Sequence, residues 1–221
     1  MLNSSKLFIQ VVLPYMKLSE KEREDMEGEP KEFVNYSLDI CQKQLSRTYK
    51  SQAAKLLENL ADNVDGLLSF AAELLTQFMT SVVTGEVTVQ AYVADVLSKF
   101  GLHFTSDEEL LDVCLICLSV LSYAVVKRGE LMAALDSVVG PYLPRLLEHP
   151  STLVKNRVCL FLSFYLDQLF LNLQDKEACV EKCMLFLFTS LRLGKDSRAV
   201  VLQALDALTS QLKDGLLKEK I

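Results

Sequence analysis

Apolar residues recur at helical spacing along nearly the whole chain. In 64–84 they form one continuous stripe, and the segments 31–46, 151–172 and 197–213 repeat the same spacing of three and four residues. Residues spaced in this way lie on one face of an α-helix, whereas the buried residues of a strand alternate every second position. No stretch of the sequence sustains that alternation. The pattern therefore predicts an all-α protein.

Glycine, proline and capping residues indicate where the helices begin and end. Pro30 and Pro150 stand where two helices are expected to start, and Gly129 stands where another is expected to end; proline favours first helical turns and glycine favours helix ends. Ser106 and Glu109 have the spacing of a capping box, which opens a helix. The predicted helices are 4–17, 31–46, 50–62, 64–84, 88–100, 106–127, 130–148, 151–172, 175–193 and 197–213.

The short connections between these helices place neighbours antiparallel, so the helices are expected to form pairs. The pairs are 31–46 with 50–62, 64–84 with 106–127, 130–148 with 151–172, and 175–193 with 197–213. Helix pairs that recur every 40–47 residues or so are typical of HEAT repeats. We therefore expect one HEAT-like helical-hairpin solenoid, an α–α superhelix of about four to five pairs, over residues 1–221.

Helix 4–17 belongs to none of these pairs, and two other segments receive an interpretation of their own. Helix 88–100 is interpreted as an insertion within the second pair. Eight of the eleven residues of 19–29, SEKEREDMEGE, are charged. Segments with so few apolar residues bury too little surface to fold by themselves, so 19–29 is predicted to be a flexible acidic loop.

The composition narrows the classes of function. The chain has 23 basic and 29 acidic residues and a net charge of −6, which opposes binding to nucleic acid because phosphate binders carry a basic face. The six cysteines follow no secretory signal, which favours a reducing compartment, cytosol or nucleus. The very apolar segments 110–126 and 159–173 carry polar residues and fall short of the roughly 20 residues of a membrane span. Both are interpreted as buried helices, with no membrane insertion.

The cysteines offer little chemistry. Cys114 and Cys117 form a C-x-x-C, but it lies in an apolar helical run without a second pair at zinc-finger spacing. Cys179 and Cys183 share a helix face, and no histidine or acidic pair completes a metal site there. We therefore expect these cysteines to pack in the core, with no cofactor and no bound metal.

The histidines and basic residues indicate binding and not catalysis. His103 lies in a connecting segment and His149 at a helix end, and neither neighbours a recognisable nucleophile motif, so the chain is not expected to be an enzyme. Four basic residues lie at or near the starts of second helices, where two roles stay open: pairing with acidic groups of neighbouring repeats, or contact with a partner. These candidate partner contacts are Lys155, Arg157, Lys195 and Arg198.

Residues 105–213 resemble the importin-β superfamily, the nuclear transport receptors also called karyopherins. The resemblance rests on VVGPYLPRLLEHPSTLVKNRVCLFLSFYLDQL at 138–169 and on CVEKCMLFLFTSLRLGKDSRAVVLQALDALTSQL in the following pair. In this family a first helix ends in a V-x-P-x-L-like turn, and a second helix opens with a small polar residue, a basic residue and an apolar run. Residues 11–40, VVLPYMKLSEKEREDMEGEPKEFVNYSLDI, resemble the subgroup of importins seven and eight and the CAS-type exportin. Met26 stands near the place where that subgroup has an aromatic residue.

The resemblance implies a protein-binding segment of a nuclear transport receptor that works in cytoplasm and nucleus and at the nuclear pore. Its partners would be proteins: cargo on a flexible helical surface, and the Phe-Gly repeats of nucleoporins between neighbouring outer helices. Family members are several times longer, so this chain looks like a middle segment, and the GTPase Ran would be bound through parts outside it. The alternative is a HEAT-repeat scaffold of a complex unconnected with transport. Selective binding to Phe-Gly repeats distinguishes the two.

Overall fold

The structure is a computed structural model that describes residues 2–42, 48–166, 168–169, 176–193 and 198–214. Every regular element in these ranges is a helix, which confirms the predicted all-α class. The elements are α1 (Leu2–Leu7), the π-helical turn η1 (Phe8–Val12), α2 (Leu13–Met16), α3 (Glu20–Gly28), α4 (Pro30–Cys41), α5 (Tyr49–Asn63), α6 (Leu67–Thr84), α7 (Val87–Phe100), α8 (Asp107–Val120), α9 (Ser122–Val126), α10 (Gly129–Val139), the 3-10 turn η2 (Gly140–Tyr142), α11 (Leu143–Leu147), α12 (Thr152–Tyr165), α13 (Lys176–Leu193) and α14 (Arg198–Asp214).

The local breaks have identifiable causes. Pro14 has no N–H to give to an i−4 carbonyl, and just before it the backbone widens, with the N–H of Leu13 donating to the carbonyl of Phe8. Gly85 and Gly101 end α6 and α7 with φ values of 65°, a conformation that glycine adopts without a steric penalty. Pro141 lies in η2, where the predicted helix 130–148 divides into α10 and α11.

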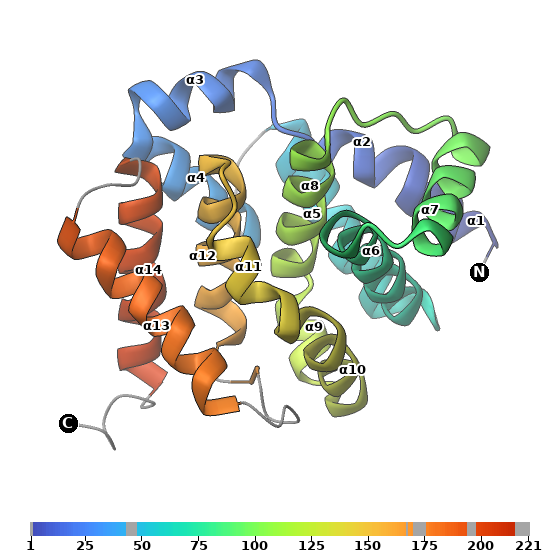
Figure 1. Ribbon diagram of the computed structural model, residues 1–221. Helices are drawn as coiled ribbons and strands as arrows, with labels where there is room; N and C mark the ends of the chain where they lie inside the picture. The colour runs from blue at the N-terminus through green and yellow to red at the C-terminus, as the bar shows by residue number, and fades with distance from the viewer. Residues whose placement is uncertain (1, 43–47, 167, 170–175, 194–197, 215–221) are drawn as a thin grey trace.

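Helices α8 and α12 lie at the centre of the molecule. Every α8 residue from Leu110 to Val120 is buried, as is every α12 residue from Asn156 to Ser163. The two helices pack on each other, α8 also packs on α6, and α12 also packs on α14. These four helices form a row through the fold (Figure 1). The very apolar segment 110–126 and residues 159–165 of the segment 159–173 thus supply central helices, because a helix covered on several sides needs apolar residues all round.

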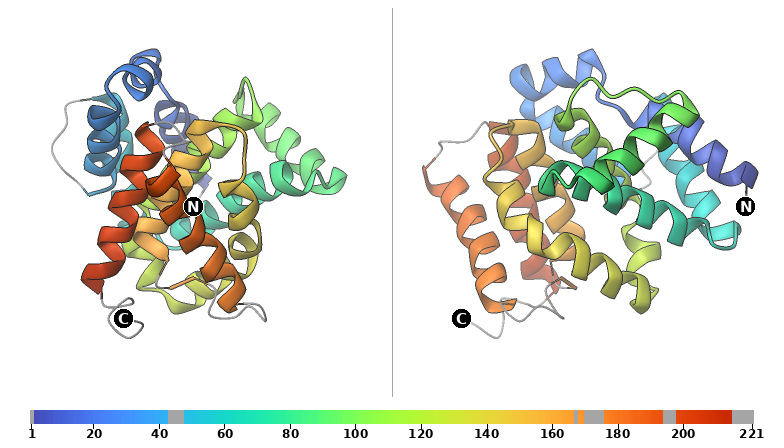
Figure 2. Two further views of the ribbon diagram at one scale, coloured as in Figure 1. Left: turned by 60° about the vertical axis from the view of Figure 1, so that its left-hand side comes forward. Right: turned by 45° about the vertical axis from the view of Figure 1, so that its right-hand side comes forward.

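Other helices cover the row. Helices α11 and α13 contact each other and pack on α12 and α14 respectively, while α4 and α5 both pack on α8. The left view of Figure 2 shows α4 and α5 on one side of α12 and α14, with α11 and α13 on the other. All four predicted pairs are in contact, as α4 with α5, α6 with α8, α11 with α12, and α13 with α14. Helix α7, predicted as an insertion, packs on α6.

The N-terminal helices run across the fold from one end of this row to the other. Helix α1 packs on α6, α2 packs on α5 and α8, and both α3 and α4 pack on α14 (Figure 1). The repeats of a strictly linear stack contact only their neighbours. The contact of α3 and α4 with α14 joins the first described part of the chain to the last, which is a departure from such a stack.

The predicted acidic loop over 19–29 is wrong for residues 20–28, which form α3. Ser19 caps the helix: its Oγ accepts a hydrogen bond from the N–H of Glu22, and Glu22 Oε2 accepts one from the N–H of Ser19. Glu22 and Met26 are both buried and lie four residues apart on one face. The average hydropathy of the segment is low and gives no sign of this pair. Two buried side chains and a capping box are enough to hold a helix that is otherwise polar.

One helix of the described residues, α6, is long and apolar enough to cross a membrane by length and composition, with a mean hydropathy of 1.3. It packs in the interior against α7, α8 and α10, and 56% of its most apolar window is buried. The core helix of a soluble protein passes the same test of length and composition.

Candidate functional site

Arg157, predicted to be a candidate partner contact, is fully buried between three helices. Its Nε donates a hydrogen bond to Asp112 Oδ1 of α8, and its Nη1 donates to Ser37 Oγ of α4 at 2.7 Å. The guanidinium carbon lies 4.9 Å from the centroid of the Phe33 ring. The prediction that Arg157 contacts a partner is therefore wrong, because its side chain is buried in the fold. Residues of α4 and α8 that are far from Arg157 in the sequence surround its side chain, and no local sequence pattern reports that packing.

The other three candidate contacts do not converge. Lys155 is half-buried, with its Nζ 5.9 Å from the centroid of the Phe186 ring. Arg198 is exposed at the start of α14 and lines a hollow of about 440 Å³ with Arg23 of α3. Glu27 and Glu108 line the same hollow, so two acidic groups balance its two arginines. Lys195 lies outside the described residues.

The cysteines and histidines considered for catalysis or metal binding lie in the core, at a helix end or at the surface. Cys114 and Cys117 are fully buried, and burial raises the pKa of both thiols well above the ordinary value of 9.0. His103 is exposed, while His149 Nδ1 accepts a hydrogen bond from the N–H of Ser151 at 3.1 Å, at the entry to α12. Within the described ranges no three residues of the metal-ligating types lie together. Cys183 is buried; the side chain of Cys179 lies outside what the structure describes.

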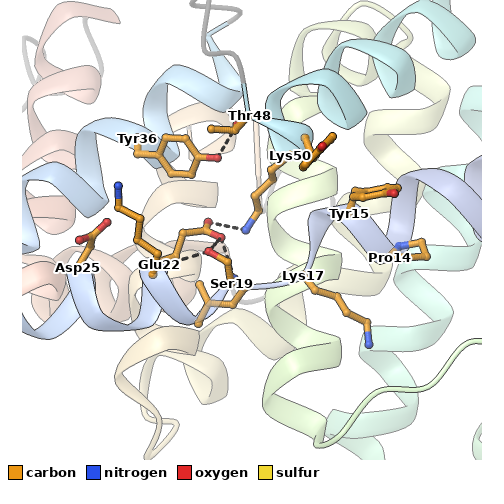
Figure 3. A pocket seen from close by; sticks show the side chains of 12 residues that line it. Pro14, Tyr15, Lys17, Ser19, Glu22, Asp25, Tyr36, Thr48 and Lys50 are labelled. Atoms are coloured by element: carbon orange, nitrogen blue, oxygen red, sulfur yellow. Dashed lines mark hydrogen bonds and ion pairs between the residues drawn. The ribbon is translucent and has the colours of Figure 1, made fainter.

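A hollow of about 440 Å³ opens where α2 and α3 face α4 and α5 (Figure 3). Tyr15 and Tyr49 lie on its rim with their ring centroids 5.8 Å apart, and they are 51% and 81% exposed. Tyr36 and Thr48 also line it and share a hydrogen bond of 2.7 Å between their hydroxyl groups. We call this the tyrosine hollow.

An ion pair crosses the floor of the tyrosine hollow. Lys50 Nζ of α5 donates to Glu22 Oε1 of α3 at 2.6 Å, and the two residues are 5% and 7% exposed (Figure 3). Burial by itself raises the pKa of the Glu22 carboxyl, but the neighbouring Lys50 charge and the hydrogen bonds from Lys50 and Ser19 outweigh it, so the pKa is lowered from its ordinary value. Glu22 is therefore ionised at neutral pH and links α3 to α5.

A third concave region is an open groove between α6, α7 and the segment that leads into α8, lined by six apolar residues and five polar or charged ones. Its volume is about 350 Å³. Its apolar lining consists of Val82, Val93, Ala94, Leu97, Phe104 and Leu110. We call this the α7 groove. It lies between neighbouring helices, so it can accept an apolar side chain from a partner.

The sequence analysis missed both the tyrosine hollow and the α7 groove. The signal for the first was available, because Ser19 and Glu22 have the capping-box spacing. The α7 groove has no comparable signal, since its lining comes from three segments whose approach depends on tertiary packing. Comparison with protein-family models, curated proteins and solved structures finds no match to this chain.

Proposed function

We propose that this chain is a protein-binding segment of a nuclear transport receptor of the importin-β kind, working in the cytoplasm and nucleus and at the nuclear pore. The resemblance of residues 11–40 and 105–213 to that family supports the proposal at the level of sequence. The α7 groove supports it at the level of structure, because it offers an apolar site between neighbouring helices. Cargo would bind elsewhere on the helical surface, and Ran through parts outside this chain.

A HEAT-like arrangement belongs to the same proposal. It is supported by the contacts within all four predicted helix pairs and by the row formed by α6, α8, α12 and α14. In such an array the helices that cover the row present the grooves between them to solvent. Helices α1–α3 would be an addition to that array, lying along one side of it.

The apolar part of the α7 groove supports the proposal that it binds a Phe-Gly repeat. A phenylalanine ring transferred from water into it would contact Val82, Leu97 and Phe104 and lose its apolar hydration. The glycine beside each phenylalanine lets the peptide backbone come close to the groove rim. A single ring in an open groove gives weak binding, and many repeats acting together give avidity without slow release.

The test is retention of the purified chain on immobilised Phe-Gly repeats, beside repeats in which every phenylalanine is changed to serine. We expect retention on the Phe-Gly resin alone. Equal retention on both resins, or on neither, by a chain whose circular dichroism is helical would contradict the proposal and favour a HEAT scaffold outside the pore.

Filling the α7 groove tests its part in that binding. Ala94 lines the groove, whereas Ala91 lies on the same helix, is also exposed and is not a lining residue. Ala94→Trp is expected to weaken binding to a Phe-Gly peptide about tenfold, equivalent to losing roughly 1.4 kcal/mol of contact. Ala91→Trp should leave the dissociation constant unchanged in the same fluorescence titration. If the wild-type chain binds and the two variants bind equally well, the phenylalanine binds elsewhere.

A further inference from the structure

Within the described part of the fold, helix α3 buries two of its own side chains. Seven of its nine residues are charged, and Glu22 and Met26 are its buried residues. The helix lies over α4 and α14 at the edge of the molecule (Figures 1 and 2). Because Glu22 and Met26 stand four residues apart, both point to the same side, where they meet two different kinds of contact.

The first contact is polar. Glu22 Oε1 accepts the hydrogen bond from Lys50 Nζ at the floor of the tyrosine hollow, and Glu22 Oε2 accepts from both the N–H and the hydroxyl of Ser19 (Figure 3). One carboxylate thus caps α3 and ties it to α5. Loss of its charge weakens both attachments together.

The second contact is apolar and separate from the main core. Met26 belongs to a small cluster with Phe33 and Val34 of α4, Leu153 of α12 and Ala199 of α14. The other large buried residues of the fold form one continuous core to which this cluster does not belong. Leu38 packs against both clusters, but Met26 belongs to the small one alone, so its departure removes no residue from the main core.

The energetics favour opening of this helix by itself. A helix of nine residues is too short to be stable in water without its tertiary contacts. Segments with few buried apolar contacts open at a fraction of the free energy of global unfolding. α8 and α12, in contrast, are buried along most of their length and can open only when the whole fold does.

We propose that α3 is a clasp that opens separately from the rest of the fold, held shut by the Glu22–Lys50 ion pair and by Met26 in its apolar cluster. Opening frees the ammonium group of Lys50 and exposes the apolar side chains that Met26 covers, among them Phe33 and Leu153. It also removes one of the two contacts between the N-terminal helices and α14. The clasp thus controls access to a surface that is covered in the closed fold. This inference is independent of the proposed function.

Hydrogen exchange measured by mass spectrometry on the full chain at pH 7 tests the clasp. Amides of 20–28 are expected to exchange at least about a hundredfold faster than those of α8 and α12, through local opening. Glu22→Gln and Met26→Ala should each speed exchange in α3 about tenfold further and leave α8 and α12 unchanged. Glu24→Gln is the matched control, because Glu24 is exposed on the same helix, and it should change nothing.

Two results would overturn the clasp. In the first, α3 of the wild-type chain exchanges at the rate of α8 and α12, so that it opens only with global unfolding. In the second, Glu22→Gln and Met26→Ala speed exchange in all helices equally. Far-ultraviolet circular dichroism of each variant, compared with the wild-type spectrum, separates these outcomes from a general failure to fold.

Discussion

Replacing Arg157 by methionine is expected to lower the free energy of unfolding by about 3–5 kcal/mol, the range seen when one partner of a buried ion pair is removed. The substitution leaves the Asp112 carboxylate fully buried without its partner charge. It also removes the donor to Ser37 Oγ and the cation above the Phe33 ring. The stranded charge dominates the loss, because an unpaired buried carboxylate cannot recover its hydration.

Urea unfolding followed by circular dichroism measures this effect. Arg198→Met is the matched control, since it makes the same change at an exposed arginine of α14 and should leave the midpoint nearly unchanged. An Arg157→Met midpoint equal to that of the control would show that the ion pair does not stabilise the fold.

The double variant Arg157→Met with Asp112→Leu separates the stranded charge from lost packing. Both ionic groups are then gone, and apolar side chains of similar size fill the site, a change that is often neutral or stabilising. The ion pair also leaves two buried polar atoms unsatisfied, because Asp112 Oδ2 and Arg157 Nη2 have no hydrogen-bond partner within the described part of the chain. The double variant removes both atoms. The double variant is therefore expected to regain most of the loss. A double variant no more stable than Arg157→Met would place the cost in lost packing and not in the charge.

The helical class and most helix starts were predictable because they depend on local signals. Residues 106 and 109 show one detail that such signals predict and one that they do not. Ser106 Oγ accepts from the N–H of Glu109 as the capping box predicts, but the Glu109 carboxylate accepts from Thr105 and not from Ser106. The predicted start of the helix is confirmed, but the donor to the Glu109 carboxylate is Thr105, one residue before the predicted Ser106.

The burial of Arg157 was not predictable, because it depends on contacts between distant parts of the chain. Arg157 and Ser37 are 120 residues apart in sequence, and their contact requires the tertiary packing that brings α4 to the side chain of Arg157. An arginine near the start of an amphipathic helix looks the same whether it faces water or a later-packed helix. The same limit applies to α3, whose position on α14 follows from Met26 reaching a cluster built by three other helices.

Alkaline pH is expected to unfold the protein through its buried thiols. Cys41, Cys114 and Cys117 are buried, and burial raises the pKa of each, for Cys41 from 9.0 to about 12. Tyr165, whose hydroxyl donates to the carbonyl of Leu118, also has a raised pKa because of burial. In every case the protonated group is the one that fits the core.

The sign follows from comparing the two states. Below the unfolded pKa near 9, both states hold the proton and stability is fully present. Above it, the unfolded thiol ionises while the folded one does not, so each thiol removes roughly 1.4 kcal/mol per pH unit until the folded pKa is reached. Three thiols together give about 4 kcal/mol per unit, enough to exhaust a typical stability of roughly 5–15 kcal/mol within a few pH units.

The measurement is the free energy of urea unfolding at intervals from pH 7 to pH 11, under a reducing agent. We expect little change up to pH 8.5 and a steep fall beyond it. The triple variant Cys41→Ala, Cys114→Ala, Cys117→Ala should start less stable, because it leaves small cavities, yet lose stability with pH much more slowly. The two proteins are compared by the slope of the free energy of unfolding against pH, so the constant loss of stability caused by the cavities does not affect the comparison. Equal slopes in the two proteins would mean that other groups, with Tyr165 the first candidate, carry the alkaline transition.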